Sequence, residues 1–244
     1  MNRRILAISI LGLGLSLPAQ AANLDTINLL LTLPQPQLQF RLLSEDLGAA
    51  LSYKPLIPAE PLGLTGFDLG IEVSATKLQN TAVYAKVTGD STDTLILPRL
   101  HVHKGLPFGF DLGASYAAVP NSNIKLWGAE VRYAILKGGT ATPALALRGS
   151  YSSLEGVSQL KFNTAGVDLS ISKGFAMFTP YAGLGKVWVR STPDASIPFL
   201  VEEKFDLNKV FVGVNMNLAF VNIAIEGDKT GAATSYGIKF GWRF

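Results

Sequence analysis

The two histidines of the chain, His101 and His103, have the type and spacing that could do chemistry. Two positions apart on a strand, they point to the same side, and Arg99 shares that side. Paired imidazoles could chelate a metal ion or supply a catalytic base. The same residues could form a polar network inside the protein, because their spacing specifies no third metal ligand. We predict no metal, no cofactor and no enzymatic activity.

Other kinds of site are excluded by composition. The chain has no cysteine, which excludes disulfides, thiolate chemistry and a lipid anchor on a cysteine. No phosphate-binding glycine loop, zinc-protease helix or nucleophile elbow appears. Charged residues make up only 16% of the chain. The net charge of +3 falls to about +1 without residues 1–21, so nucleic acid is not an expected partner.

Further charged side chains fall on one face of alternating segments. The predicted inward-facing set is Asp68, Glu72, Arg99, His101, His103, Glu130, Arg132, Arg148, Asp168, Glu226 and Lys239. Buried charges must be paired, and Glu226 and Lys239 lie on consecutive segments where they could pair directly. The set could rigidify a narrow interior or form a polar constriction in a pore.

The alternation itself predicts β-strands. In the first segment, Phe67, Leu69 and Ile71 alternate with polar or small residues, and similar segments recur to the end of the chain. The expected strands are 65–76, 94–104, 108–117, 123–135, 143–153, 160–173, 178–190, 208–218, 220–229 and 233–244. Segments of about ten residues can cross a bilayer as tilted strands, and lipid requires the sheet to close. We therefore predict an all-β fold, a transmembrane antiparallel β-barrel of about ten strands.

A soluble β-sandwich would also alternate, but two features count against it. Aromatic residues gather at the ends of the segments, as expected for girdles at the membrane interfaces. The opposite face is consistently polar and rich in glycine.

Two details fit the predicted barrel less well. Pro98 predicts a bulge, and the segment 178–190 shows apolar residues on both faces, so its orientation stays open.

The N-terminal part of the chain has two predicted regions. Residues 1–21 combine Arg3 and Arg4, a 13-residue apolar stretch and the motif Ala19-Gln20-Ala21, which together predict a cleaved signal peptide. Residues 22–64 hold an expected short helix after Ser44, then three prolines that oppose regular structure. This region is predicted to be a periplasmic arm or a plug in the barrel. The alternative adds two strands from 22–57, giving twelve.

The C-terminal strand carries the alternating residues Tyr236, Ile238, Phe240, Trp242 and Phe244. This pattern resembles the insertion signal of the outer-membrane β-barrel superfamily, and the resemblance covers residues 65–244. The segment from Pro58 to Ile71 looks like uncharacterised members, with OmpW-like and FadL-like barrels as distant relatives. The resemblance implies the outer membrane of a Gram-negative cell. The implied partners are outer-membrane lipid, the barrel assembly machinery and small hydrophobic solutes, with the protein a monomer.

Three functions follow as hypotheses. The first is a narrow pore or channel for small, hydrophobic or other, solutes. The second is a structural or surface-interaction barrel with a closed lumen. The third is an outer-membrane lipid-modifying enzyme that uses His101 or His103 at the edge of the lumen.

Overall fold

The computed structural model describes residues 26–89, 91–118, 124–139 and 141–244, so the predicted signal peptide lies outside the described residues. Ten antiparallel strands form a closed barrel, in which each strand pairs with its neighbours in sequence and β1 pairs with β10. The strands are β1 (Phe67–Lys77), β2 (Thr94–Gly105), β3 (Phe110–Ala118), β4 (Lys125–Lys137), β5 (Ala144–Glu155), β6 (Leu160–Ser172), β7 (Phe178–Pro193), β8 (Glu203–Leu218), β9 (Val221–Thr230) and β10 (Ala233–Arg243). The prediction of a ten-stranded antiparallel barrel is confirmed, and the twelve-strand alternative is wrong.

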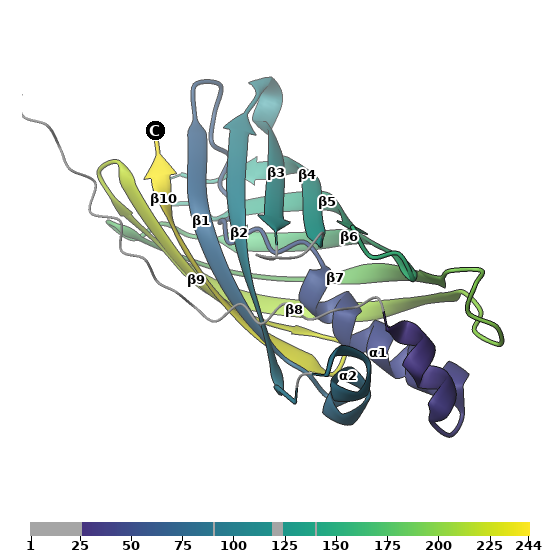
Figure 1. Cartoon of the computed structure of the whole chain (residues 1–244). Helices are drawn as coiled ribbons and strands as arrows, with labels where there is room; N and C mark the ends of the chain where they lie inside the picture. Colours follow the sequence, from purple (N-terminus) through teal and green to yellow (C-terminus); the bar gives the residue numbers. More distant parts are fainter. Residues whose placement is uncertain (1–25, 90, 119–123, 140) are drawn as a thin grey trace, which may run out of the picture.

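The helical elements are η1 (Ile27–Thr32), α1 (Pro36–Leu51), α2 (Thr81–Thr88) and the short η2 (Pro107–Gly109). Figure 1 shows α1 and α2 at the end of the barrel opposite to the C terminus. We call these two ends the helix end and the C-terminal end. None of the helices in the described ranges is long and apolar enough to cross a membrane.

Residues 36–62 form a plug inside the barrel. Helix α1 enters at the helix end, where the backbone amides of Gln79 and Asn80 donate to the carboxylate of Asp46. Burial raises the pKa of Asp46, and these hydrogen bonds oppose that rise. Residues 52–62 then run without helix or strand to the C-terminal end, where the backbone amide of Leu62 donates to Asp111 at 3.1 Å.

The expected helix after Ser44 begins eight residues earlier, at Pro36. Proline is favoured in the first turn because its φ is preset and its missing donor costs nothing there. Ser44 therefore caps nothing, and its hydroxyl donates to the Phe40 carbonyl one turn back. The prolines that follow do prevent regular structure, as the sequence indicated.

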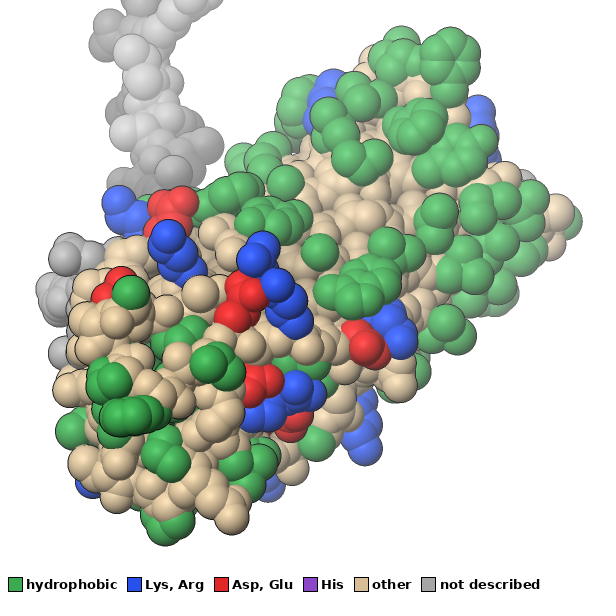
Figure 2. All heavy atoms as spheres, turned by 90° about the vertical axis from the view of Figure 1, so that its right-hand side faces the viewer, with side chains coloured by type: hydrophobic (Ala, Val, Ile, Leu, Met, Phe, Trp, Pro, Cys, Tyr) green, Lys and Arg blue, Asp and Glu red, His purple; other side chains and the backbone are tan. Residues whose placement is uncertain are grey.

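The two halves of the barrel bury opposite kinds of side chain. Toward the C-terminal end the outer surface is apolar, with Ile71 and Leu184 more than half exposed at 54% and 63%. Toward the helix end the interior is apolar, and η1, α1 and α2 pack there against buried strand residues such as Phe162 and Val189. Figure 2 shows the outer surface on one face: hydrophobic side chains gather at its upper right, and charged ones form a band across its middle.

This division explains the segment that could not be oriented from sequence. In β7, Tyr181, Val187 and Val189 face inward, whereas Leu184 and Trp188 face outward. The strand passes from the half with an apolar exterior to the half with an apolar interior, so both of its faces carry apolar residues. Sixteen residues at about 3.3 Å, tilted by about 40°, reach about 40 Å, which is longer than a hydrocarbon core of roughly 30 Å.

Two boundary details also differ from expectation. Strand β8 begins at Glu203, five residues before the predicted start, because it stays paired with the long β7 as far as Ser191. No bulge occurs at Pro98, since the β1–β2 register is continuous through Val73 and Pro98. The pairing of β2 with β3 begins only at Leu100, so the missing amide of Pro98 leaves no gap in that ladder.

Candidate functional site: the charged lumen

The structure places the whole predicted inward-facing set inside the barrel. All eleven side chains are buried, and Asp168, at 7%, is the most exposed residue among them. They project from β1, β2, β4, β5, β6, β9 and β10 because residues of one parity on each strand face the lumen. Most of them lie in the half of the barrel whose exterior is apolar.

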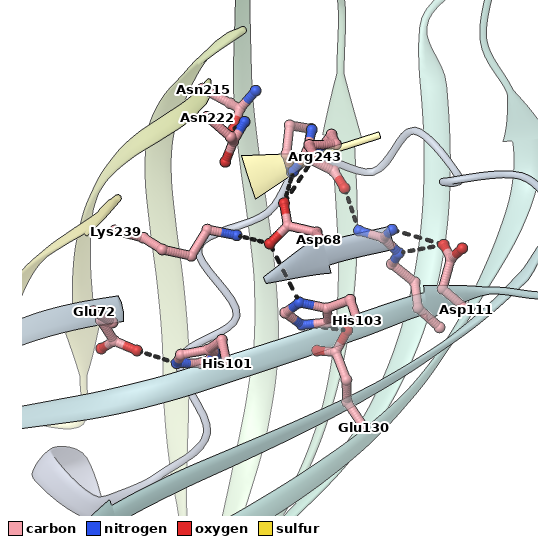
Figure 3. Close-up of polar contacts among 12 residues, drawn as sticks. Asp68, Glu72, His101, His103, Asp111, Glu130, Asn215, Asn222, Lys239 and Arg243 are labelled. Atoms are coloured by element: carbon pink, nitrogen blue, oxygen red, sulfur yellow. Dashed lines mark hydrogen bonds and ion pairs between the residues drawn. The ribbon is translucent and has the colours of Figure 1, made fainter. Parts of the chain in front are cut away.

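Asp68 is the centre of one cluster, drawn in Figure 3. Its Oδ1 accepts from Lys239 Nζ at 2.7 Å, and its Oδ2 accepts from Arg243 at 2.9 and 2.6 Å. His103 Nδ1 lies 3.8 Å from the same carboxylate. One buried carboxylate thus faces two full positive charges and an imidazole, which offsets the cost of its burial.

His103 connects this cluster to a second one. Its Nε2 lies 3.5 Å from Glu130 Oε1, and Glu130 Oε2 lies 3.4 Å from Arg148 Nη1. Arg148 Nε lies 3.2 Å from Asp168 Oδ1. Acidic and basic groups therefore alternate around the lumen wall from β1 to β6.

Glu72 binds the other histidine, His101. It forms a hydrogen bond with His101 Nε2 and accepts from Arg99 Nη1 at 3.0 Å. Arg99 also donates from Nη2 to the carbonyl of Ala50, at the end of α1, at 2.7 Å. The interior wall and the plug are therefore bonded through the same guanidinium group.

The expected pair between Glu226 and Lys239 does not form. In the β9–β10 register Glu226 lies opposite Gly237, and Lys239 lies opposite Ala224. Lys239 binds Asp68 instead, and Glu226 accepts from the hydroxyl of Tyr181 at 3.0 Å. Lys239 and Asp68 lie on β10 and β1, which are neighbours only because the barrel closes, and Tyr181 and Glu226 lie on β7 and β9, which are not paired. Adjacency along the sequence reveals neither partner.

Several members of the network were not singled out from sequence. Asp111 accepts from Arg132 at 3.1 and 2.6 Å and belongs to the same inward parity as the predicted residues, so alternation could have found it. Lys54 lies in the plug, where no periodic signal exists, and its Nζ binds Asp228 at 2.8 Å and Ser235 at 3.1 Å. Lys209 donates to the backbone carbonyl of Tyr53 at 3.1 Å.

The plug is bonded to the wall along its length. The hydroxyl groups of Ser44 and Ser191 are hydrogen-bonded near the helix end, with 2.8 Å between their Oγ atoms. Lys54 and Tyr53 make the contacts just described in the middle. Near the C-terminal end, Arg132 donates to the backbone carbonyls of Pro58 and Glu60.

The chemistry open to this site is limited by its burial. His101 and His103 are 1% and 0% exposed, and Tyr53 lies against both rings, so neither imidazole faces solvent. Among the described residues, no group of three or more acidic or histidine side chains has an arrangement that could hold a metal ion. The geometry fits a network that fills the lumen and holds the plug.

Comparison with known proteins adds little beyond architecture. No protein-family model and no curated protein matches the chain. Among solved structures it is similar to the N-terminal β-barrel domain of Pseudomonas aeruginosa OprF, with 13% identity and a TM-score of 0.36, covering 72% of this chain and 97% of that domain. OprG from the same organism matches at 11% identity and a TM-score of 0.35, covering 77% and 99%.

The outer membrane protease OmpT from Escherichia coli matches at 7% identity and a TM-score of 0.39, covering 73% of this chain and 95% of that one. At such values no activity is carried over from any of the three. The chain's own strand order and closure define a closed, ten-stranded antiparallel β-barrel. Whether it is closer to OmpW-like or FadL-like barrels stays a prediction.

Proposed function

We propose that this protein is an outer-membrane barrel whose lumen is closed by its own N-terminal segment, and that it acts through its helix end. In this proposal the signal peptide is removed after Ala21 and the C-terminal end faces the periplasm. The helix end, with α1, α2 and the long β7–β8 hairpin, then faces outward. The apolar core at that end gives the exposed loops a rigid base.

The observation that carries the proposal is the course of the plug. It is bonded to the wall near the helix end through Ser44, in the middle through Lys54, and near the C-terminal end through Leu62. Charged side chains that would line a pore, such as Asp68, Glu72 and Asp228, are already paired with one another or with the plug. A solute would have to break buried ion pairs to pass, which is costly.

Planar-bilayer conductance tests this proposal. The unmodified mature protein should insert without producing current steps at moderate voltage. The barrel should remain folded in the same preparation, as shown by β-rich circular dichroism. Steady conductance from the unmodified protein would overturn the closed-lumen proposal.

A gated narrow pore is the second candidate, favoured by the polarity of the wall. If the plug moved out, the lumen of the C-terminal half would be lined by charged and amide side chains such as Glu130, Arg148 and Asn215, which water would solvate. Solute transport, hydrophobic or otherwise, would then follow plug movement.

A single cross-link separates the two candidates. Replacing Ser44 and Ser191 by cysteine would place two thiols where the hydroxyl oxygens lie 2.8 Å apart, in a chain that has no other cysteine. If the protein is a gated pore, conductance should be lost on oxidation and return with a reductant. If the lumen is closed, both states should be silent.

We also propose that the protein is not an enzyme, on the ground that both histidines are enclosed by the plug and by Glu72, Asp68 and Glu130. Replacing both histidines by glutamine should leave the lipid composition of the host membrane unchanged. Altered lipid acylation would contradict this and favour a lipid-modifying activity. The monomeric state and recognition by the barrel assembly machinery remain part of the proposal.

A further inference from the structure

A hollow of about 540 Å³ lies on the outer wall of the barrel across β5, β6, β7 and β8. The part of the hollow nearer the C-terminal end is a slot, in which Tyr151, Ala165 and Trp188 occupy consecutive positions across three strands. Strands lie about 4.8 Å apart, so the backbone positions of Tyr151 and Trp188 are about 10 Å from each other, with the methyl group of Ala165 between them. The hydroxyl of Tyr151 donates to Asn163 on β6 at 2.9 Å. An extended acyl chain fits between such walls.

The next row of the same hollow, toward the helix end, is cationic. Arg190 lies opposite Lys204 in the β7–β8 register, and both are more than half exposed. They share one carboxylate, that of Glu202. The remaining acid of the hollow, Asp206, is paired with Lys186 at 2.8 Å. Three cations and two carboxylates leave one positive charge without a counterpart in this group.

We propose that this hollow binds one anionic phospholipid-type molecule of the surrounding leaflet, with its phosphate at Arg190 and Lys204 and an acyl chain over Ala165. The inference rests on the proposed membrane location. The order of outward side chains along β7 supports it, because Leu184 lies on the C-terminal side of Trp188 and Arg190 lies on its helix side. Lys186, between Leu184 and Trp188, is paired with Asp206. Tyr and Trp are the residues that prefer the boundary between acyl chains and headgroups.

Lipid fits this surface better than a second copy of the chain. The hollow spans the boundary between the apolar belt and the charged rim, so an occupant must be charged at one end and apolar at the other. A phosphodiester would neutralise the unmatched charge, and each cation near such a surface favours anionic lipid.

The test uses Trp188 as the reporter. With Trp127 and Trp242 replaced by phenylalanine, Trp188 is the only tryptophan in the chain. The protein is reconstituted in phosphatidylcholine vesicles containing either brominated phosphatidylglycerol or brominated phosphatidylcholine, and bromine quenching is titrated. The expected relative binding constant favours phosphatidylglycerol by about fivefold, the effect of one net charge at the surface.

Two variants and one control make the result specific. R190Q/K204Q should reduce the preference to about one. K77Q/K229Q removes the same charge from exposed lysines of β1 and β9, outside the hollow, and should keep it. A165F fills the slot and should weaken quenching by both lipids. Equal quenching by both headgroups in the parent, or equal loss in both double variants, would overturn the site. Absence of quenching by either lipid would instead overturn the membrane location.

Discussion

The C-terminal half of the barrel has an apolar outer surface and a charged interior, whereas its helix half has a charged outer surface and an apolar interior. In the first half, Leu184 and Val212 face outward while Asp68 and Arg148 are buried. In the second half, Arg190 and Lys204 face outward while Phe162 and Val189 are buried. Strand β7 contributes to both halves without a change in alternation. Side-chain polarity, and not strand geometry, therefore marks the boundary between the two halves.

The two interiors also differ in how they hold the plug. Toward the helix end, α1 is packed by apolar contacts from Phe40, Leu43 and Leu47. Toward the C-terminal end, the chain of the plug is held by ion pairs and by donors aimed at its carbonyls. Apolar packing tolerates small changes, whereas a buried charge without its partner is costly. The largest single-residue effects are therefore expected in the charged half.

Replacing Asp68 by leucine should have the largest effect on stability. The change leaves Lys239 buried without its hydrogen-bonded carboxylate and should lower the free energy of unfolding by about 4 kcal/mol. Urea unfolding in vesicles, followed by tryptophan fluorescence, measures it. The plug pair offers a control: the double variant K54M/D228L removes both charges together and should lose much less. A loss under about 1 kcal/mol for the single change would contradict the comparison.

Truncating Leu47 to alanine tests the apolar half. Leu47 is 1% exposed in the core formed by α1 and the strands, and the cavity should cost about 3.5 kcal/mol. The same unfolding measurement applies. Leu38, on the exposed start of α1, is the matched control, since its truncation should cost far less. Equal losses at the two leucines would mean that α1 is not packed as described.

A lysine scan along the outside of β7 tests where the membrane ends. Leu184→Lys should destabilise the inserted barrel by about 3 kcal/mol, because the charge would face hydrocarbon. Arg190→Lys, on the same face six residues further on, should change little, because that position already carries a charge. Unfolding of both variants in vesicles gives the profile. A similar loss at the two positions would erase the proposed boundary.

The smallest effect is expected for the surface pair of Lys186 and Asp206. Their side chains are 44% and 48% exposed, and such pairs contribute little because water and salt screen them. Lys186→Gln should change the free energy of unfolding by under about 0.5 kcal/mol. At high salt, the difference in the free energy of unfolding should be smaller still. A loss comparable to that of Asp68→Leu would show that charge burial is not what separates the two halves.

The strands were predictable from sequence because the alternation is local and has a period of two. The ten strands and the inward side of residues such as Glu130 and Arg132 follow from it directly. What alternation does not contain is the partner of each charge, since Lys239 reaches Asp68 and not Glu226. It also does not show which face is apolar where a strand passes from one half of the barrel to the other, so the orientation of β7 could not be predicted.

The plug was the hardest part to predict. Its three prolines indicate irregular backbone but give no position in space. Lys54 in isolation looks like a surface lysine, and only the surrounding wall makes it a buried partner of Asp228. The start of α1 was misplaced because Ser44 and the acids after it resemble a cap, whereas Pro36 was the real signal.

The path of the plug restricts the order of assembly. Helix α1 packs at the helix end of the barrel, yet the chain reaches the C-terminal end before β1 begins. The N-terminal segment therefore passes through the barrel that the rest of the same chain forms. The barrel is completed only when the first strand meets the last, from Asp68 opposite Arg243 to Lys77 opposite Thr234. Unless the N-terminal segment enters lengthwise through an open end, it must lie inside before the first and last strands pair. After closure the segment can leave only lengthwise through an open end of the barrel. Its release is then governed by the rate of that movement as much as by the equilibrium between the bound and released states.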